Sequence, residues 1–201
     1  MIYVKRKQSL WRLNNDDNDN VEQRISVSQN KEERRMQKYI GIRRYVSAPE
    51  MKEAYMSLGR NDENAAILLA QQRLYNEAVY MHIQAMEKKI KGYICGKINA
   101  SNPYFSKKLR DIGHSLDVSI DFLIEILGGN NDALKSQLSV QLKSGVFENI
   151  RFSNLYNASR YPCYDPNGKR YSVLEIGRED YLKIANIGKK LDKFIEDFDR
   201  L

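Results

Sequence analysis

Arginine and tyrosine side chains gather in one stretch late in the chain, at Arg151, Tyr156, Arg160 and Tyr161. If this stretch is helical, Tyr156 and Arg160 lie four residues apart and share a face. A guanidinium can form two parallel hydrogen bonds to a phosphate, and a phenol ring can stack on a nucleobase. The stretch therefore predicts a binding site for a nucleotide or RNA. The alternative is structural: Arg160 pairs with a carboxylate such as Glu87, and Tyr161 anchors the core with its hydroxyl bonded.

The two histidines, His82 and His114, are the natural candidates for acid–base chemistry near neutral pH. His82 precedes Ile83 on an apolar face, which favours a packed, hydrogen-bonded role over a catalytic one. His114 lies two residues before a predicted helix, which favours a capping role. Neither has partners at metal-ligand spacing, so we expect no metal, and we expect no cofactor. Glycine-rich phosphate loops are absent, which disfavours an autonomous nucleotide-hydrolysing fold. We therefore predict no catalytic residue, and His82 and His114 are kept only as weak alternatives for that role.

Three lysines, Lys88, Lys89 and Lys91, lie close together on one predicted helix. They are most simply the solvated edge of an amphipathic helix. The alternative for Lys88 and Lys91 is that their ammonium groups face a phosphate, and both are binding candidates on that basis.

Positive charge is concentrated near the N-terminus. The 201 residues contain 33 Lys and Arg and 26 Asp and Glu, a formal net charge of +7. Residues 1–45 hold eleven of the cations and six of the acids, and therefore +5 of the +7. We predict a basic arm here, partly loop or disordered around the Asn/Asp-rich residues 14–20 and helix-compatible over residues 31–44. The arm is either a solvated appendage or a binding segment for nucleic acid or a partner subunit.

The composition and the lack of a long apolar run predict a soluble, cytoplasmic protein with no membrane partner. The two cysteines, Cys95 and Cys163, form no CxxC motif and cannot build a disulfide scaffold, which favours a reducing compartment. No apolar run approaches the ~18–20 residues that span a bilayer. Residues 1–7 lack the apolar stretch of a signal peptide.

Downstream of the arm, residues 46–201 are predicted to fold as one all-α bundle of about four to six helices. Ser47 and Glu50 match a capping box that starts the first helix, and Gly59 is expected to end it. Apolar residues then recur at helical spacing over residues 61–74, 76–95, 116–127, 131–145 and 178–198. The turn signal Asp165-Pro-Asn-Gly168, between aromatic residues, predicts a short hairpin-like insert near residues 161–173.

Three motifs occur in order along this body: Gln84-Ala85-x-Glu87-Lys88, His114-Ser115-Leu116 and Tyr156-x-x-x-Arg160-Tyr161-Pro162. Together they resemble the HEPN domain family over roughly residues 60–200. The resemblance implies an up-and-down α-helical bundle that often forms a homodimer and that binds nucleotides or RNA. Many members are RNA-cleaving toxins or defence nucleases, and many are partners of small nucleotidyltransferases.

The nuclease members of that family carry an Arg followed, after four to six residues, by a His in a late helix. The positions that this spacing allows after Arg151 and Arg160 hold no histidine, so the usual general base near pH 7 is absent there. We therefore expect a non-catalytic nucleotide- or RNA-binding module or partner subunit. One alternative is a ribonuclease of a toxin or defence system with a displaced catalytic set, such as His82 or His114 with Arg160 and Tyr161. The other is a protein-interaction scaffold.

Overall fold

The computed structural model describes residue 41 and residues 44–200. The chain divides into two units, Met1–Tyr45 and Val46–Leu201, and every helix and strand named below belongs to the second unit, the helical body. The expectations for the basic arm over residues 1–40, 42 and 43, including most of the helix predicted at 31–44, lie outside the described residues.

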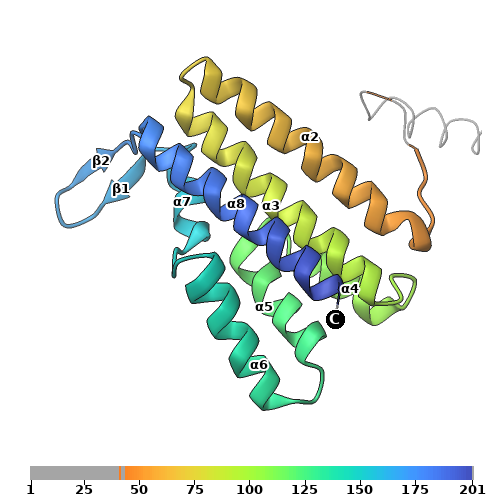
Figure 1. Cartoon of the computed structure of the whole chain (residues 1–201). Coiled ribbons are helices and arrows are strands. Elements are labelled where there is room, and N and C mark those ends of the chain that lie inside the picture. The colour runs from red at the N-terminus through yellow and green to blue at the C-terminus, as the bar shows by residue number, and fades with distance from the viewer. Residues whose placement is uncertain (1–40, 42–43, 201) are drawn as a thin grey trace, which may run out of the picture. The chain divides into compact units, whose positions relative to one another are not determined.

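Seven α-helices pack together in the part of the chain that is described, beside a two-stranded ribbon (Figure 1). In chain order the elements are the 3₁₀ turn η1 (Ala48–Glu50), α2 (Met51–Gln71), α3 (Tyr75–Lys97), α4 (Pro103–Asp111), α5 (Leu116–Gly128), α6 (Asp132–Ser139), the π-helical segment η2 (Val140–Val146), α7 (Phe152–Ala158), β1 (Cys163–Asp165), β2 (Arg170–Ser172) and α8 (Arg178–Asp199). The predicted all-α bundle is confirmed. The count exceeds the expected range because α4 and α7 are too short to show a clear apolar period. None of the helices among these residues is long and apolar enough to cross a bilayer.

The first long helix begins as predicted but does not end where expected. The Glu50 carboxylate accepts hydrogen bonds from the backbone amide and the hydroxyl of Ser47, at 2.9 and 2.6 Å. α2 then continues through Gly59 to Gln71, so the predicted end at Gly59 is wrong. A Cβ atom at position 59 would lie 3.1 Å from Lys89 Cγ and 3.2 Å from the Ala85 carbonyl oxygen. Gly59 therefore allows α2 to approach α3 closely.

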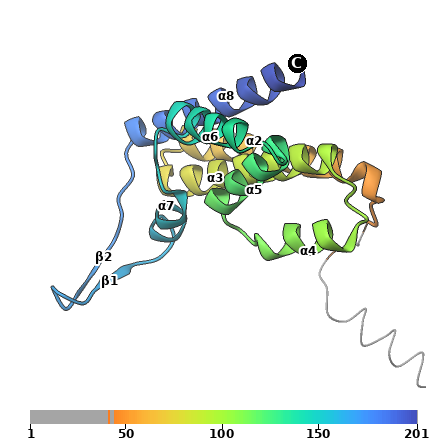
Figure 2. The ribbon, with the colours of Figure 1, turned by 90° about the horizontal axis from the view of Figure 1, so that it is seen from below.

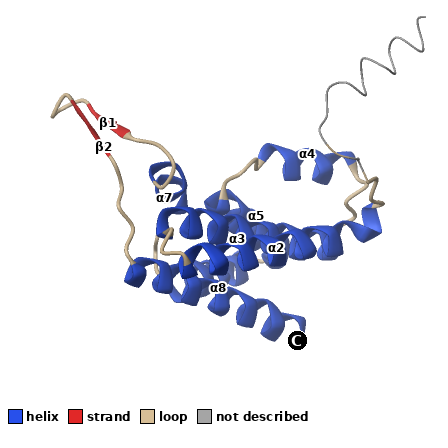
Figure 3. Cartoon of the chain, turned by 90° about the horizontal axis from the view of Figure 1, so that it is seen from above, coloured by secondary structure: helices blue, strands red, loops and turns tan. Residues whose placement is uncertain are grey.

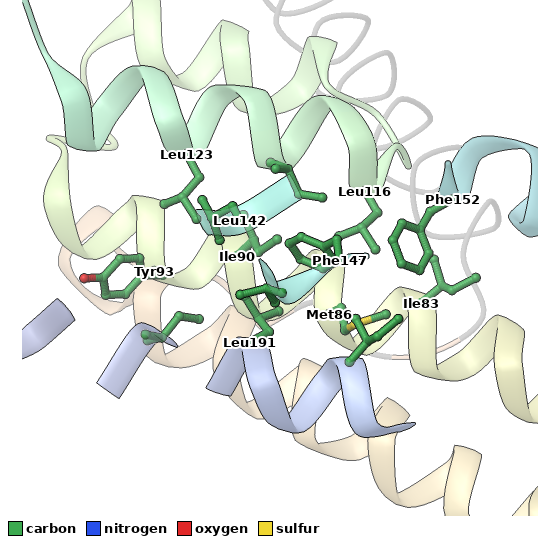
Figure 4. Close-up of a cluster of buried hydrophobic side chains, with 14 of the residues drawn as sticks. Ile83, Met86, Ile90, Tyr93, Leu116, Leu123, Leu142, Phe147, Phe152 and Leu191 are labelled. Atoms are coloured by element: carbon green, nitrogen blue, oxygen red, sulfur yellow. The ribbon is translucent and has the colours of Figure 1, made fainter. Parts of the chain in front are cut away.

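α3 is the central helix of the body. α2 packs along it, and α5 and α8 also pack against it (Figure 1). Its predicted apolar stripe is buried throughout, with the members Val79, Ile83, Met86, Ile90 and Ile94. Figure 4 shows side chains of α3 meeting side chains from α5, η2 and α8 in one apolar cluster. Because α3 is covered on several sides, it also buries polar side chains, among them His82, Glu87, Lys89 and Lys91.

A carboxylate on α5 fixes the start of α7. Asp117 accepts hydrogen bonds from the backbone amides of Phe152 and Ser153, at 3.1 and 2.8 Å. A helix leaves its first amides without intrahelical partners, so a carboxylate placed there stabilises the helix end. α5 therefore positions α7, and with it the side chain of Tyr156.

The predicted hairpin-like insert is confirmed. β1 and β2 pair antiparallel, with Tyr164 opposite Tyr171. Asp165 starts the turn, because its carboxylate accepts a hydrogen bond from the Asn167 amide at 3.0 Å. Figures 2 and 3 show this hairpin projecting from the helices beyond the end of α7.

Candidate functional site

α7 is held on α3 through the hydroxyl of Tyr156. That oxygen accepts a hydrogen bond from Gln84 Nε2 at 2.8 Å and lies 3.5 Å from the Tyr80 hydroxyl. The rings of Tyr80 and Tyr156 are 5.1 Å apart between centroids. α7 itself ends at Ala158, but the amide of Arg160 still donates to the Asn157 carbonyl at 3.1 Å. The chain therefore remains in a helical turn up to Arg160, as the site prediction required.

The Arg160 guanidinium lies among three tyrosine rings. Its carbon is 4.7, 5.5 and 4.8 Å from the ring centroids of Tyr80, Tyr156 and Tyr161. Its Nη2 atom donates a hydrogen bond to the Tyr161 hydroxyl at 2.9 Å. A cation over an aromatic face is attracted by the ring quadrupole, so these contacts hold the guanidinium in place. Tyr156, Arg160 and Tyr161 were predicted together as site residues. Tyr80 was not predicted, because the sequence distinguishes it only by its position one helical turn before Gln84.

Arg160 makes no ion pair with any carboxylate of residues 44–200, and its side chain is exposed. The alternative in which it pairs with Glu87 is wrong, because Glu87 is already paired with Lys91. The core-anchor interpretation of Tyr161 is wrong as well, because Tyr161 is exposed, although its hydroxyl is bonded as expected. Both side chains thus lie at the surface, where a ligand can reach them.

Arg160 and Tyr161 line a cleft of about 420 Å³. Its walls are the turn between α2 and α3, the end of α7 and both chain segments that lead into the hairpin. Asn76 ties these walls together, since its side chain donates to the Leu174 carbonyl at 2.7 Å and accepts from the Ile176 amide at 3.0 Å. Arg73 contributes a second cation from the α2–α3 turn, a residue that sequence analysis did not single out.

The Tyr156 hydroxyl is a poor proton acceptor. Burial, followed by the hydrogen bond with Tyr80, raises the pKa of Tyr156 to about 12, although Arg160 acts in the opposite direction. A phenol that serves as a general base needs a lowered pKa. Tyr156 therefore stays protonated at neutral pH and cannot replace the missing histidine.

A buried carboxylate lies one turn further along α3. Glu87 is 2% exposed, and its Oε1 atom accepts a hydrogen bond from Lys91 Nζ at 2.7 Å. Lys91 also donates to the Gly113 carbonyl, and Lys88 is paired with Asp62. The solvated-edge interpretation is therefore wrong for Lys91, which is buried. The structure does not bring Lys88 or Lys91 to the Arg160 cleft.

The two histidines have different surroundings. The His82 ring is 3% exposed and packs edge-on against Tyr181, and burial lowers its pKa. The predicted packing of His82 is confirmed, but its Nδ1 atom has no hydrogen-bond partner among the residues described. The His114 side chain is 75% exposed, with Nδ1 3.8 Å from Glu87 Oε1. Neither histidine lines the Arg160 cleft.

Arg151 lies at the other end of α7. It lines a separate cavity of about 570 Å³ together with Asp117, Asp121 and Lys143. Because no residue lines both cavities, the structure separates Arg151 from the other arginine and tyrosine candidates. Arg151 therefore does not contribute to the site around Arg160.

Within residues 44–200 no group of three or more His, Cys, Asp or Glu side chains is arranged to hold a metal ion. Comparison with known protein families, with curated proteins and with solved structures gave no match. The function is therefore inferred from the geometry of the cleft.

Proposed function

We propose that this protein is a HEPN-like module that binds a nucleotide or single-stranded RNA at the Arg160 cleft without cleaving it. The observation that carries the proposal is the exposed Arg160 guanidinium, held among three tyrosine rings and not ion-paired within residues 44–200. Such a guanidinium can fork onto a phosphate with little loss of side-chain freedom, because its plane is already fixed.

The other walls of the cleft suit the remaining parts of a nucleotide. Arg73 adds a positive charge, and the exposed ring of Tyr161 offers a face on which a base can stack. The volume of about 420 Å³ lies within the range of ordinary small-ligand sites. Glu77 and Glu175 also line the cleft and balance the two arginines in formal charge, so the proposal rests on the exposed guanidinium and the aromatic face, which suit a phosphate and a base, and not on a net positive charge.

The same residues support a non-catalytic role. No histidine lines the cleft, and the pKa of Tyr156, whose ring packs against Arg160, is about 12, so neither residue type supplies a general base near pH 7. The exposed carboxylates of Glu77 and Glu175 also line the cleft, but no histidine lies beside them to complete an acid–base pair.

Fluorescence anisotropy with labelled single-stranded RNA, and competition by ATP, tests the proposal at low salt. Arg160→Ala should weaken binding at least about tenfold, because a charge-assisted hydrogen bond is lost. Arg110→Ala is the matched control, since it removes an exposed arginine from α4 and outside the cleft. If neither RNA nor ATP binds the wild-type protein, the proposal is wrong and a protein-interaction scaffold becomes the better account.

The proposal extends to partner subunits. As the HEPN resemblance implies, the protein would act as a homodimer or beside a nucleotidyltransferase. Light scattering coupled to size-exclusion chromatography tests the first assembly, and co-purification with a nucleotidyltransferase encoded by an adjacent reading frame tests the second.

One observation favours a second candidate function, a ribonuclease with a displaced catalytic set. The exposed His114 imidazole has the Glu87 carboxylate 3.8 Å from its Nδ1 atom. A carboxylate beside one ring nitrogen can orient the imidazole so that the other nitrogen takes up a proton. Incubation with tRNA and mRNA distinguishes the two functions. Cleavage that His114→Ala abolishes, while the fold is retained, would favour the ribonuclease, and intact RNA at high protein concentration would exclude it.

A further inference from the structure

We propose that the hairpin is a second contact surface for the nucleic acid, on which Tyr164 and Tyr171 stack unpaired bases of an RNA strand that extends from the Arg160 cleft. This inference rests on the proposed function, because it assumes that the cleft holds a nucleotide of that strand. It specifies the ligand as single-stranded RNA rather than a free nucleotide.

The first observation is the exposure of two large rings on a surface that nothing in the body covers. Tyr164 and Tyr171 lie directly opposite each other in the ribbon, with ring centroids 5.1 Å apart. They remain 55% and 70% exposed. A cross-strand aromatic pair stabilises a ribbon, but it does not require so much open ring surface. The open faces are available to stack on bases, which all present a π-face.

The second observation is that the cleft and the hairpin are continuous. Tyr161 and Pro162 line the cleft, and β1 begins at the next residue, Cys163. On the return side β2 ends at Ser172, and Val173 again lines the cleft. An RNA strand that leaves the cleft between Tyr161 and Val173 therefore meets the base of the hairpin first.

The third observation is the charge of this segment. The hairpin, residues 163–172, contains two cations, Lys169 and Arg170, and one acid, Asp165. The contact of Arg170 with Asp165 is long, at 3.9 Å, and solvent-exposed, so it leaves the guanidinium available. Lys169 forms no ion pair with the other described residues and lies at the turn of the hairpin. Cations that flank aromatic rings match the alternation of phosphates and bases along a single strand.

The geometry is less suitable for a protein partner that adds a β-strand. Each strand of the hairpin has three residues, so an added strand would gain few backbone hydrogen bonds. Val173 adds an exposed apolar side chain next to the ribbon, but the tyrosines are also flanked by Lys169 and Arg170, and charged residues are depleted in the core of a typical protein interface.

The test compares two ligands on five proteins. The ligands are a labelled single-stranded RNA of about twelve nucleotides, within the usual site size, and ATP. The proteins are the wild type, Arg160→Ala, a Tyr164→Ser/Tyr171→Ser variant, a Tyr164→Phe/Tyr171→Phe variant, and Tyr104→Ser. Tyr104 is an exposed tyrosine on α4 and serves as the matched control. Unchanged melting temperatures establish that each variant is folded.

We expect the double serine variant to bind the RNA at least about fivefold more weakly, while its affinity for ATP stays that of the wild type. The double phenylalanine variant should bind RNA as the wild type does, because stacking needs the ring and not the hydroxyl. RNA affinity that is unchanged in the double serine variant but lowered in Arg160→Ala overturns this inference and leaves the proposed function standing. Binding of ATP but not of RNA by the wild type would likewise overturn it, and failure of the wild type to bind either ligand would remove the proposed function itself.

Discussion

The guanidinium carbon of Arg160 lies 4.7 Å from the ring centroid of Tyr80, which joins the end of α7 to the first turns of α3. The contact places an exposed cation over a ring that belongs to the central helix. Because Tyr80 is anchored on α3 and close to the Tyr156 hydroxyl, Arg160 is held by the body rather than by its own flexible segment. The cleft is therefore organised before a ligand arrives.

Replacing Tyr80 tests this organisation without removing a group that touches the ligand. Tyr80→Leu removes the ring under Arg160 and should raise the dissociation constant for RNA by about threefold to tenfold, since a cation–π contact contributes roughly 0.5–1.5 kcal/mol. Tyr80→Phe keeps the ring and should change the affinity little. Equal affinities for the Leu and Phe variants in anisotropy titrations would show that the ring does not position Arg160.

Lys89 should be far more important for stability than Lys97. The Lys89 side chain is buried and donates to Glu63 of α2 and Asp192 of α8, both at 2.8 Å. Burial alone would lower the pKa of Lys89, but the bonds to these carboxylates raise it. Lys89→Met should therefore lower the free energy of unfolding by about 3 kcal/mol, the lower end of the range for a broken buried pair, because both carboxylates are partly exposed.

The control for that variant is Lys97→Met. Lys97 pairs with Asp199 at 2.8 Å, but both side chains are well exposed. Such a surface pair contributes about 0–1 kcal/mol. Urea denaturation of both variants gives the comparison, and similar losses at the two positions would contradict the account of α3 as an ion-paired central helix.

Gly188→Ala should destabilise the body, whereas Gly145→Ala should not. A Cβ atom at position 188 would lie 2.5 Å from His82 Nε2, inside the core between α3 and α8. Overpacking of this kind costs about 1–3 kcal/mol. No atom lies within 4 Å of a Cβ at position 145, and alanine is the better helix former there. Thermal unfolding of both variants measures the difference, and a stable Gly188→Ala protein would mean that the His82 ring can move aside.

His82 should make the folded state sensitive to mild acid. Burial lowers its pKa below the ordinary 6.5, so the folded state binds fewer protons at this group than the unfolded state does. Stability then rises with pH through this window and is lost as the pH falls below about 6.5. The free energy of unfolding of the wild type should drop between about pH 7.5 and pH 5, and the drop should be smaller in His82→Gln. An equal drop in both proteins would assign the acid sensitivity to other groups.

Much of the fold is predictable because its helices bury regular apolar stripes. The apolar stripe from Val79 to Ile94 closely predicts the bounds of α3, and the turn signal that begins at Asp165 predicts the hairpin. Gly59 shows where the same approach fails. A glycine in a helical sequence can end a helix or permit a close helix contact, and only the position of α3 decides between these roles.

The site was predictable only where its residues are neighbours in sequence. Tyr156, Arg160 and Tyr161 share one stretch, and the structure does bring them together. Tyr80 and Arg73 come from other elements and carry no signal of their own until the packing of α7 on α3 is known. The prediction for Lys91 was wrong for a related reason: its partner Glu87 lies four residues earlier on the same helix, but the burial of the pair depends on the other elements that pack around α3.

The most direct test of the central claim is to map where RNA touches the protein. Single-stranded RNA that contains 4-thiouridine is crosslinked to the wild-type protein by near-ultraviolet light, and the modified residues are located by mass spectrometry. The account predicts a crosslink at Tyr161, which lines the cleft beside the Arg160 guanidinium, and its loss in Arg160→Ala. Crosslinks confined to residues 1–45 or to α4, and unchanged in Arg160→Ala, would contradict it.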